Sequence, residues 1–138
     1  MDKNFHLHIY TPRRIFFDGK VQMVVVNTKE GKIGVMADHL PMTVAIDTGI
    51  AKIQQDDKER ELVLTEGFMT VNKNEVVILA DSAEWPEELD LQRCKDALER
   101  ADARLNDKET SSVELTRSER AVKRAKARID ILNKSEEK

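Results

Sequence analysis

The hydrophobic pattern of this chain changes its period within one short stretch, residues 84–94. Before the stretch, apolar residues alternate with polar ones, which is typical of strands with one buried face. After it, apolar residues recur every three or four positions, which is typical of amphipathic helices. Pro86 cannot continue a strand ladder, and Asp90 is a favourable N-cap for a helix. The sequence therefore predicts an α+β fold in two parts, joined by a segment with few apolar anchors.

Residues 1–85 have the pattern of an all-β part. Many short alternating runs with turn residues between them predict a β-sandwich or barrel, and we expect an antiparallel β-sandwich. Within it, the dipeptide Asp18-Gly19 predicts a tight turn. The apolar run 21–27 predicts a strand buried on both faces.

Residues 86–138 predict two helices separated by a polar break at 106–112. A short connection favours antiparallel neighbours, so we expect a two-helix antiparallel hairpin. Small residues occupy several positions of the predicted seam and remove little apolar surface from water. The seam consists of Leu91, Cys94, Leu98, Ala101 and Leu105 facing Leu115, Ser118, Val122, Ala125, Ile129 and Leu132. Such a hairpin should be marginally stable alone and able to exchange partners.

Charge is distributed unevenly along the chain. Charged residues make up 36% of the 138 residues, but the net charge is −3, which argues against a general nucleic-acid-binding protein. Residues 117–128 form a local basic segment with Glu119 as the one acid. Its basic residues are Arg117, Arg120, Lys123, Arg124, Lys126 and Arg128.

Two sets of three arginines repeat the same spacing, one set in each predicted helix. On an α-helix, residues at i, i+7 and i+11 stay within a narrow arc. The first set is Arg93, Arg100 and Arg104, and the second is Arg117, Arg124 and Arg128. In a folded hairpin the two sets could converge on one anion, although solvated surface arginines are the more ordinary interpretation.

Other chemistry-bearing residues give little support to an enzyme. The sequence has no phosphate-binding glycine loop and no recognisable nucleophile with its base. His6 and His8 share a strand face and could form a metal pair, but no third ligand is evident, so we expect no metal site. Glu84 and Asp90 could contact a ribose or base edge, although linker solvation and helix capping are the simpler roles.

The sequence also indicates a compartment. There is no apolar run of the roughly 20 residues that a membrane span needs. The N-terminus lacks the layout of a secretory signal. Cys94, the one cysteine, excludes an internal disulfide and fits a reducing compartment. We expect an intracellular protein that reaches a membrane only through a partner.

Several motifs together resemble the epsilon subunit of the F-type ATP synthase, and the match extends over nearly the whole chain. The motifs are Gly31-x-x-Gly34 followed by His39-x-Pro41, then Gly49, Gly67-Phe68 and the run 76–81. The family has the same order of sandwich and helical hairpin. No organelle transit peptide precedes the sandwich, so we expect a bacterial subunit, peripheral on the cytoplasmic side of the cell membrane.

The resemblance implies a non-catalytic rotor component that couples proton flow to ATP synthesis. The sandwich would bind the gamma subunit and the ring of c subunits. The hairpin would permit ATP hydrolysis when folded on the sandwich. Extended along gamma toward the alpha and beta subunits, it would inhibit hydrolysis, with the basic segment 117–128 meeting an acidic loop of a beta subunit.

The resemblance also implies ATP as a regulatory ligand of the folded state, with magnesium as a possible companion ion and no catalytic cofactor. Some bacterial members bind ATP through a motif of Ile or Leu, Asp, two free positions, Arg and Ala. Leu89, Asp90, Arg93 and Cys94 stand at the specified positions here, so the final alanine is replaced by cysteine. The further ATP-binding positions fall on Glu84, Arg100, Arg124 and Arg128. We expect binding to survive the cysteine, in weakened form.

Two alternatives come from other functional classes. One is a stand-alone nucleotide-binding sensor whose partner binding is incidental, which co-purification with gamma would distinguish. The other is a hydrolase that uses Glu84 or Asp90, which an assay of phosphate release by the isolated chain would test.

Overall fold

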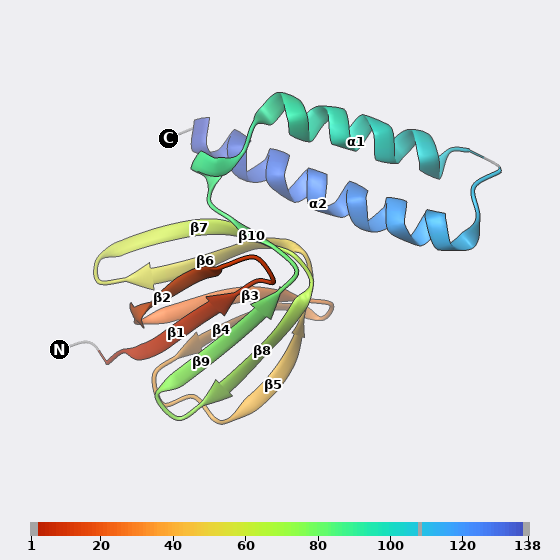
Figure 1. Ribbon diagram of the computed structural model, residues 1–138. Helices are drawn as coiled ribbons and strands as arrows, with labels where there is room; N and C mark the ends of the chain where they lie inside the picture. Colours follow the sequence, from red (N-terminus) through yellow and green to blue (C-terminus); the bar gives the residue numbers. More distant parts are fainter. Residues whose placement is uncertain (1–2, 108, 137–138) are drawn as a thin grey trace. The chain divides into compact units, whose positions relative to one another are not determined.

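The computed structural model describes residues 3–107 and 109–136. It divides into two compact units, Met1–Trp85 and Pro86–Lys138. The first contains strands and the second helices (Figure 1). The strands are β1 (Phe5–Tyr10), β2 (Ile15–Val21), β3 (Met23–Thr28), β4 (Gly31–Met36), β5 (Met42–Ile46), β6 (Gly49–Gln55), β7 (Lys58–Leu64), β8 (Gly67–Asn72), β9 (Glu75–Ala80) and β10 (Ala83–Glu84).

The first unit is a sandwich of two five-stranded sheets, as predicted. One sheet has the order β2-β1-β9-β8-β5 and the other β10-β7-β6-β3-β4. Strand pairs are antiparallel except β1 with β9, which is parallel. A parallel pair needs a long connection, and here the intervening strands of the sandwich supply it.

The core lies between the two sheets, where alternate residues of each strand point inward. The burial pattern of β1 alternates strictly, and Leu7 and Ile9 are fully buried. Ile53 and Leu62 of the second sheet are fully buried as well. Burial of these branched side chains stabilises each by roughly 1.5–3 kcal/mol relative to exposure, so the first unit has a complete core of its own.

The predicted turn at Asp18-Gly19 is wrong. Both residues lie within β2, where Asp18 pairs with His8 and Gly19 pairs with Leu7. The chain turns earlier, where the amide of Thr11 donates to the carbonyl of Arg14 at 3.0 Å. Strand pairing with β1 therefore overrides the local turn preference of this dipeptide.

The predicted strand across residues 21–27 is also corrected. A bend at Gln22 separates β2 from β3, and β3 has alternating rather than continuous burial. The apolar run thus contributes to two strands, one in each sheet.

The joining segment, expected to have few apolar anchors, has a strong one at Trp85. The ring of Trp85 stacks on Phe16 with a centroid distance of 4.5 Å. The guanidinium of Arg60 lies 3.6 Å from the centroid of the same ring, which is a cation–π contact. Trp85 is therefore an apolar anchor of this segment, since its side chain packs against the sandwich core.

The second unit contains a 3-10 turn and two helices. These are η1 (Pro86–Glu88), α1 (Leu91–Leu105) and α2 (Ser112–Glu136). Figure 1 shows α1 and α2 side by side and antiparallel, which confirms the predicted hairpin. Small side chains dominate its buried positions, including Cys94, Ala101, Ser118 and Ala125.

Burial on α2 is not confined to the predicted seam. Ser118, Val122 and Ala125 are buried as expected, whereas Ile129 is only half-buried. Ala127 and Ile131 are buried too, and at about 100° per residue they lie on the opposite side of the helix. α2 therefore has buried residues on two sides, and the sequence pattern predicted burial on only one of them.

Candidate functional site

A groove of about 690 Å³ opens at one end of the sandwich. Its apolar centre is one row of side chains across four neighbouring strands. Register pairs Tyr10 of β1 with Leu79 of β9, Leu79 with Phe68 of β8, and Phe68 with Ala45 of β5. Paired residues of adjacent strands point to the same face, so this row lies on the outward face of the first sheet.

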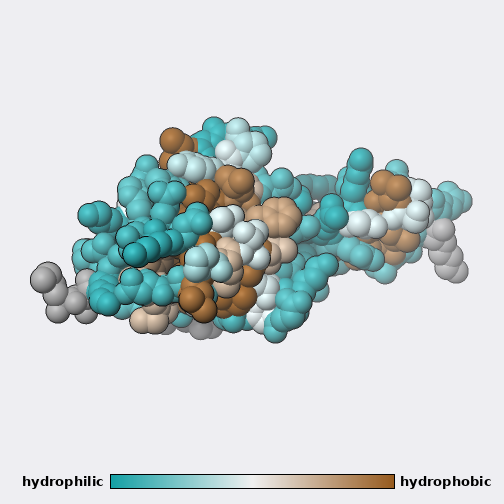
Figure 2. All heavy atoms as spheres, turned by 90° about the horizontal axis from the view of Figure 1, so that it is seen from below, coloured by the Kyte–Doolittle hydropathy of each residue, from teal (hydrophilic) through white to brown (hydrophobic). Residues whose placement is uncertain are grey.

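Two large apolar side chains of this row are exposed to solvent. Phe68 is 57% exposed and Leu79 is 55% exposed. Figure 2 shows apolar side chains gathered together on one side of the sandwich. Contiguous exposed apolar surface with a polar rim is characteristic of an interaction site, and the rim here contains Lys29, Asp47, Glu66 and Asp81.

The backbone around the groove is fixed by contacts between two corners of the sandwich. The amide of Thr65 donates to the carbonyl of Ser82 at 3.1 Å, and the amide of Ser82 donates to Oγ1 of Thr65 at 2.7 Å. The amide of Asp81 donates to the carbonyl of Glu66 at 3.0 Å. These bonds hold the start of β8 against the end of β9, which positions Phe68 beside Leu79.

In the sequence, Phe68 and Leu79 stood out only as parts of the resemblance motifs, Gly67-Phe68 and the run 76–81. Alternation places Phe68 on the same face as Thr70, opposite Met69, and that pattern could have marked it as an exposed aromatic residue. The row itself required the strand register, which joins residues far apart in the sequence.

In the helical unit, Asp90 caps α1 as predicted. Its Oδ1 accepts from the amide of Arg93 at 3.1 Å. This bond satisfies one of the amides left open at a helix N-terminus. Asp90 thus has a structural role at the position where the sequence also suggested contact with a nucleotide.

Other predicted ATP-binding positions lie in different environments. Leu89 is half-buried between η1 and α1, and its amide donates to the carbonyl of Pro86 at 3.1 Å. Cys94 is buried on the seam side of α1 and carries a free thiol. Glu84 belongs to the other unit, where it pairs with Val63 through β10.

The predicted arginines occupy equivalent positions on the two helices. Arg93 lies twelve residues before the last residue of α1, and Arg124 lies twelve residues after the first residue of α2. Counted from the connection between the helices, the two arginines are therefore equally far along their helices.

Both arginine sets also lie on the same face of the hairpin. Each set is rotated by about 110° from its own seam, in the same direction when viewed from the helix N-terminus. For antiparallel helices, equal rotations place both arcs on one side of the pair. Arg93 and Arg100 are exposed, whereas Arg124 and Arg128 are half-buried.

The six basic residues of 117–128 are distributed around α2 rather than along one line. Arg117, Arg120, Lys123 and Lys126 are exposed. At about 100° per residue, Lys126 lies opposite Arg117. Four exposed cations therefore present positive charge in several directions.

Among the residues that the structure describes, neither helix has a stretch of sufficient length and hydropathy to cross a membrane.

Comparison with protein families matches both units. Residues 4–86 match the family described as ATP synthase, Delta/Epsilon chain, beta-sandwich domain. Residues 87–133 match ATP synthase, Delta/Epsilon chain, long alpha-helix domain.

Similar curated proteins have nearly the same length as this chain. The ATP synthase epsilon chain of Caldanaerobacter subterraneus subsp. tengcongensis is 42% identical over 138 residues, which is 99% of this chain and 99% of that protein. The ATP synthase epsilon chain of Ruminiclostridium cellulolyticum is 42% identical over 130 residues, covering 94% and 96% of the two chains.

Solved structures share the fold at low sequence identity. A chain of the Euglena gracilis mitochondrial ATP synthase, in a structure of OSCP, F1 and the c-ring, superposes with a TM-score of 0.81 at 23% identity. The superposition covers 94% of this chain and 81% of that one. A chain of the Tetrahymena thermophila mitochondrial ATP synthase central stalk and c-ring gives a TM-score of 0.63 at 12% identity, covering 95% and 98%.

Proposed function

From the premise that this chain belongs to the ATP synthase delta/epsilon family, as the matches to both units and to bacterial epsilon chains show, we propose that it works in the rotor as a coupling and regulatory part. The family's subunit is a non-catalytic component of the complex. We propose that the sandwich connects the gamma subunit to the c-ring, and that the hairpin regulates ATP hydrolysis. The chain would then be peripheral at the cytoplasmic side of a bacterial membrane, held there by the complex.

The groove of the sandwich is the surface that we assign to gamma. The observation that carries this assignment is the exposed row formed by Phe68, Leu79 and their neighbours, since such surface is usually covered by a partner. One of the similar solved structures is described as a central stalk with its c-ring, which supports an occupant from the stalk. Aromatic and aliphatic anchors at the centre of an interface contribute most of its binding energy.

Replacing Phe68 and Leu79 together by serine should weaken binding of the isolated chain to gamma by about tenfold or more. Each replacement removes an exposed apolar side chain, so the sandwich core keeps its packing. Surface-immobilised gamma would report the dissociation constant. Ile15→Ser is the matched control, because Ile15 is 65% exposed but does not line the groove. Equal affinity of the double variant and the control would refute the assignment.

The helical unit is where we propose that ATP binds in the folded state. The two arginine sets lie on one face of the hairpin, and Arg93 and Arg124 are equally far from the connection between the helices, which supports convergence on a polyphosphate. ATP, with magnesium, would neutralise the arginines and favour the closed hairpin, so it would act by shifting the population of states.

Arg93→Ala and Arg124→Ala should each weaken ATP binding by roughly tenfold or more, since a hydrogen bond to a charged group contributes about 1.5–3 kcal/mol. Titration calorimetry of the full chain measures this effect. Arg120→Ala is the control, because Arg120 is a basic residue of α2 outside both arginine sets. Circular dichroism verifies that each variant keeps its helices. If both variants bind ATP like the parent chain, the proposed site does not exist.

The open state is the one that we propose to inhibit hydrolysis. Extended toward the alpha and beta subunits, α2 would present the exposed charges of Arg117, Arg120, Lys123 and Lys126 to an acidic surface of beta. Several charges that meet in a partly enclosed cleft contribute more than isolated exposed pairs. Small seam residues keep the cost of opening low, because their separation exposes little apolar area.

A further inference from the structure

A cluster of two imidazoles and a carboxylate lies on the outward face of the first sheet. His6 and His8 are two residues apart on β1 and point to the same side. Asp18 is the register partner of His8 on β2, an edge strand of the sheet. No third ligand for the histidine pair is evident from the sequence, whereas the strand pairing brings Asp18 beside both rings.

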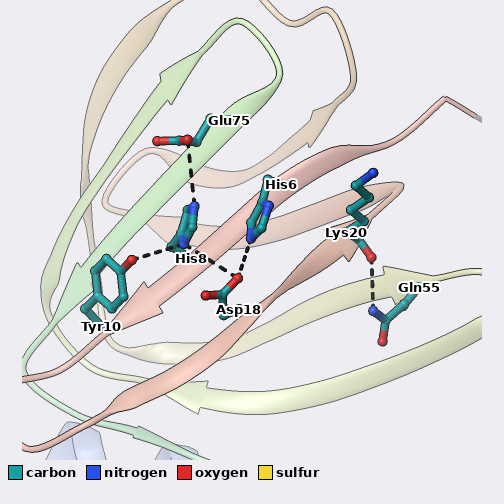
Figure 3. Close-up of polar contacts among 7 residues, drawn as sticks. All are labelled: His6, His8, Tyr10, Asp18, Lys20, Gln55 and Glu75. Carbon is teal, nitrogen blue, oxygen red and sulfur yellow. Dashed lines mark hydrogen bonds and ion pairs between the residues drawn. The ribbon is translucent and has the colours of Figure 1, made fainter.

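The donor atoms of the three side chains converge (Figure 3). One possible ligand atom from each residue lies within 4.8 Å of the other two. Nε2 of His6 contacts Oδ1 of Asp18, and Nδ1 of His8 lies 3.8 Å from the same oxygen. The imidazole rings are stacked, with a centroid distance of 4.2 Å and an interplanar angle of 9°.

Polar groups on neighbouring strands surround this cluster. Glu75 of β9 has its Oε2 3.8 Å from Nε2 of His8, on the side of the ring away from Asp18. The hydroxyl of Tyr10 is 3.1 Å from Nδ1 of His8. A carboxylate beside the second nitrogen of a metal-binding histidine fixes its tautomer and ring orientation. Lys20, the register partner of His6, is the nearby cation on β2.

We propose that His6, His8 and Asp18 form a binding site for a divalent transition-metal ion, with Zn²⁺ as the ion that the ligand set suits best. Zn²⁺ binds imidazole nitrogen and carboxylate oxygen at about 2.0–2.2 Å, commonly in a tetrahedron. Donors in such a tetrahedron are roughly 3.4 Å apart. Because the three side chains are only partly buried, small rotations can bring their donors to that separation, and water can take the fourth position.

The site would tie an edge strand to its neighbour. β2 is paired only through β1 in this sheet. An ion held by ligands from both strands adds a crosslink that is present in the folded state and absent in the unfolded one. Metal binding should therefore raise the unfolding temperature of the sandwich, since any ligand of the native state alone stabilises it.

Zinc titration of the full chain at neutral pH tests the proposal. Calorimetry should give one Zn²⁺ per chain, and nitrogen NMR should show shifts of the His6 and His8 imidazoles on binding. His6→Gln/His8→Gln should lose the site, and Asp18→Asn should weaken it more than tenfold. Glu75→Gln should weaken binding by roughly tenfold to a hundredfold, as loss of an orienting partner does.

His39→Gln is the matched control, because His39 is the third histidine and lies on the loop between β4 and β5. It should bind Zn²⁺ like the parent chain. Amide NMR spectra verify the fold of each variant, and Asp18→Asn preserves side-chain size if the double variant is unstable. Absence of zinc binding by the parent chain, or undiminished binding by the double variant, would overturn the proposal.

Discussion

Removing residues 89–138 should raise ATP hydrolysis by the assembled ATP synthase about fivefold or more, which corresponds to the lower range of coupling between sites in regulated proteins. We expect this because the hairpin, in its proposed open state, holds the catalytic head in an inhibited arrangement. The sandwich should stay folded, since Met1–Trp85 forms a compact unit with its own core. Steady-state hydrolysis by reconstituted complexes measures the effect.

Two controls separate relief of inhibition from faulty assembly. The shortened chain keeps Trp85 against Phe16 and keeps the groove, so it should bind gamma like the full chain. A full-length variant with alanine at the exposed cations of α2 tests charge without deletion, because alanine favours helix. Those cations are Arg117, Arg120, Lys123 and Lys126. Inhibition of ATP hydrolysis should be partly relieved in complexes that carry this variant. Equal rates of hydrolysis with and without the hairpin would contradict its inhibitory role.

Gly67→Ala should destabilise the sandwich by about 3 kcal/mol or more, beyond the usual cost of overpacking. A Cβ at this position would lie 1.9 Å from the carbonyl oxygen of Leu79 and 2.7 Å from Cα of Ala80. Both are backbone atoms of the paired strand β9, so no side-chain rotation can relieve the clash. The strands would have to separate at the end that forms the groove.

Urea unfolding followed by the fluorescence of Trp85, the one tryptophan, measures this loss. Trp85 packs on the sandwich, so its signal reports this unit. Gly34→Ala is the matched control, because a Cβ there would meet Val25 Cγ2 at 3.7 Å, an ordinary contact. The control should change the free energy of unfolding by less than roughly 1 kcal/mol. Equal midpoints for the two variants would show that the close approach at Gly67 is not required.

Local patterns predicted much of the architecture. The change of hydrophobic period indicated strands before residue 84 and helices after residue 94, and both are present. The carboxylate of Asp90 caps α1 as expected. Resemblance to the epsilon subunit is confirmed by the family matches and by the bacterial relatives. The hydrophobic period and the helix cap depend on residues within a few positions of one another. The resemblance depends on short sequence motifs.

Local preference failed where contacts between different elements competed with it. Asp18-Gly19 is a strong turn signal, yet pairing with β1 keeps both residues in a strand. The same pairing brings Asp18 to His8 and creates the candidate metal site. Trp85 likewise belongs to the sandwich because Phe16 and Arg60, both remote in sequence, pack against its ring.

By itself, the sequence determined the alternation of the strands, the periodicity and capping of the helices, and the order of the two units. These follow from steric and hydrogen-bonding preferences that act over a few residues. Only the tertiary structure decided that Phe68 and Leu79 form one exposed row, and that Asp18 lies beside two histidines. Both arrangements depend on the register between paired strands, β8 with β9 and β1 with β2. That register is set by strand pairing and by the burial of one sheet face, and the preferences of individual residues do not determine it.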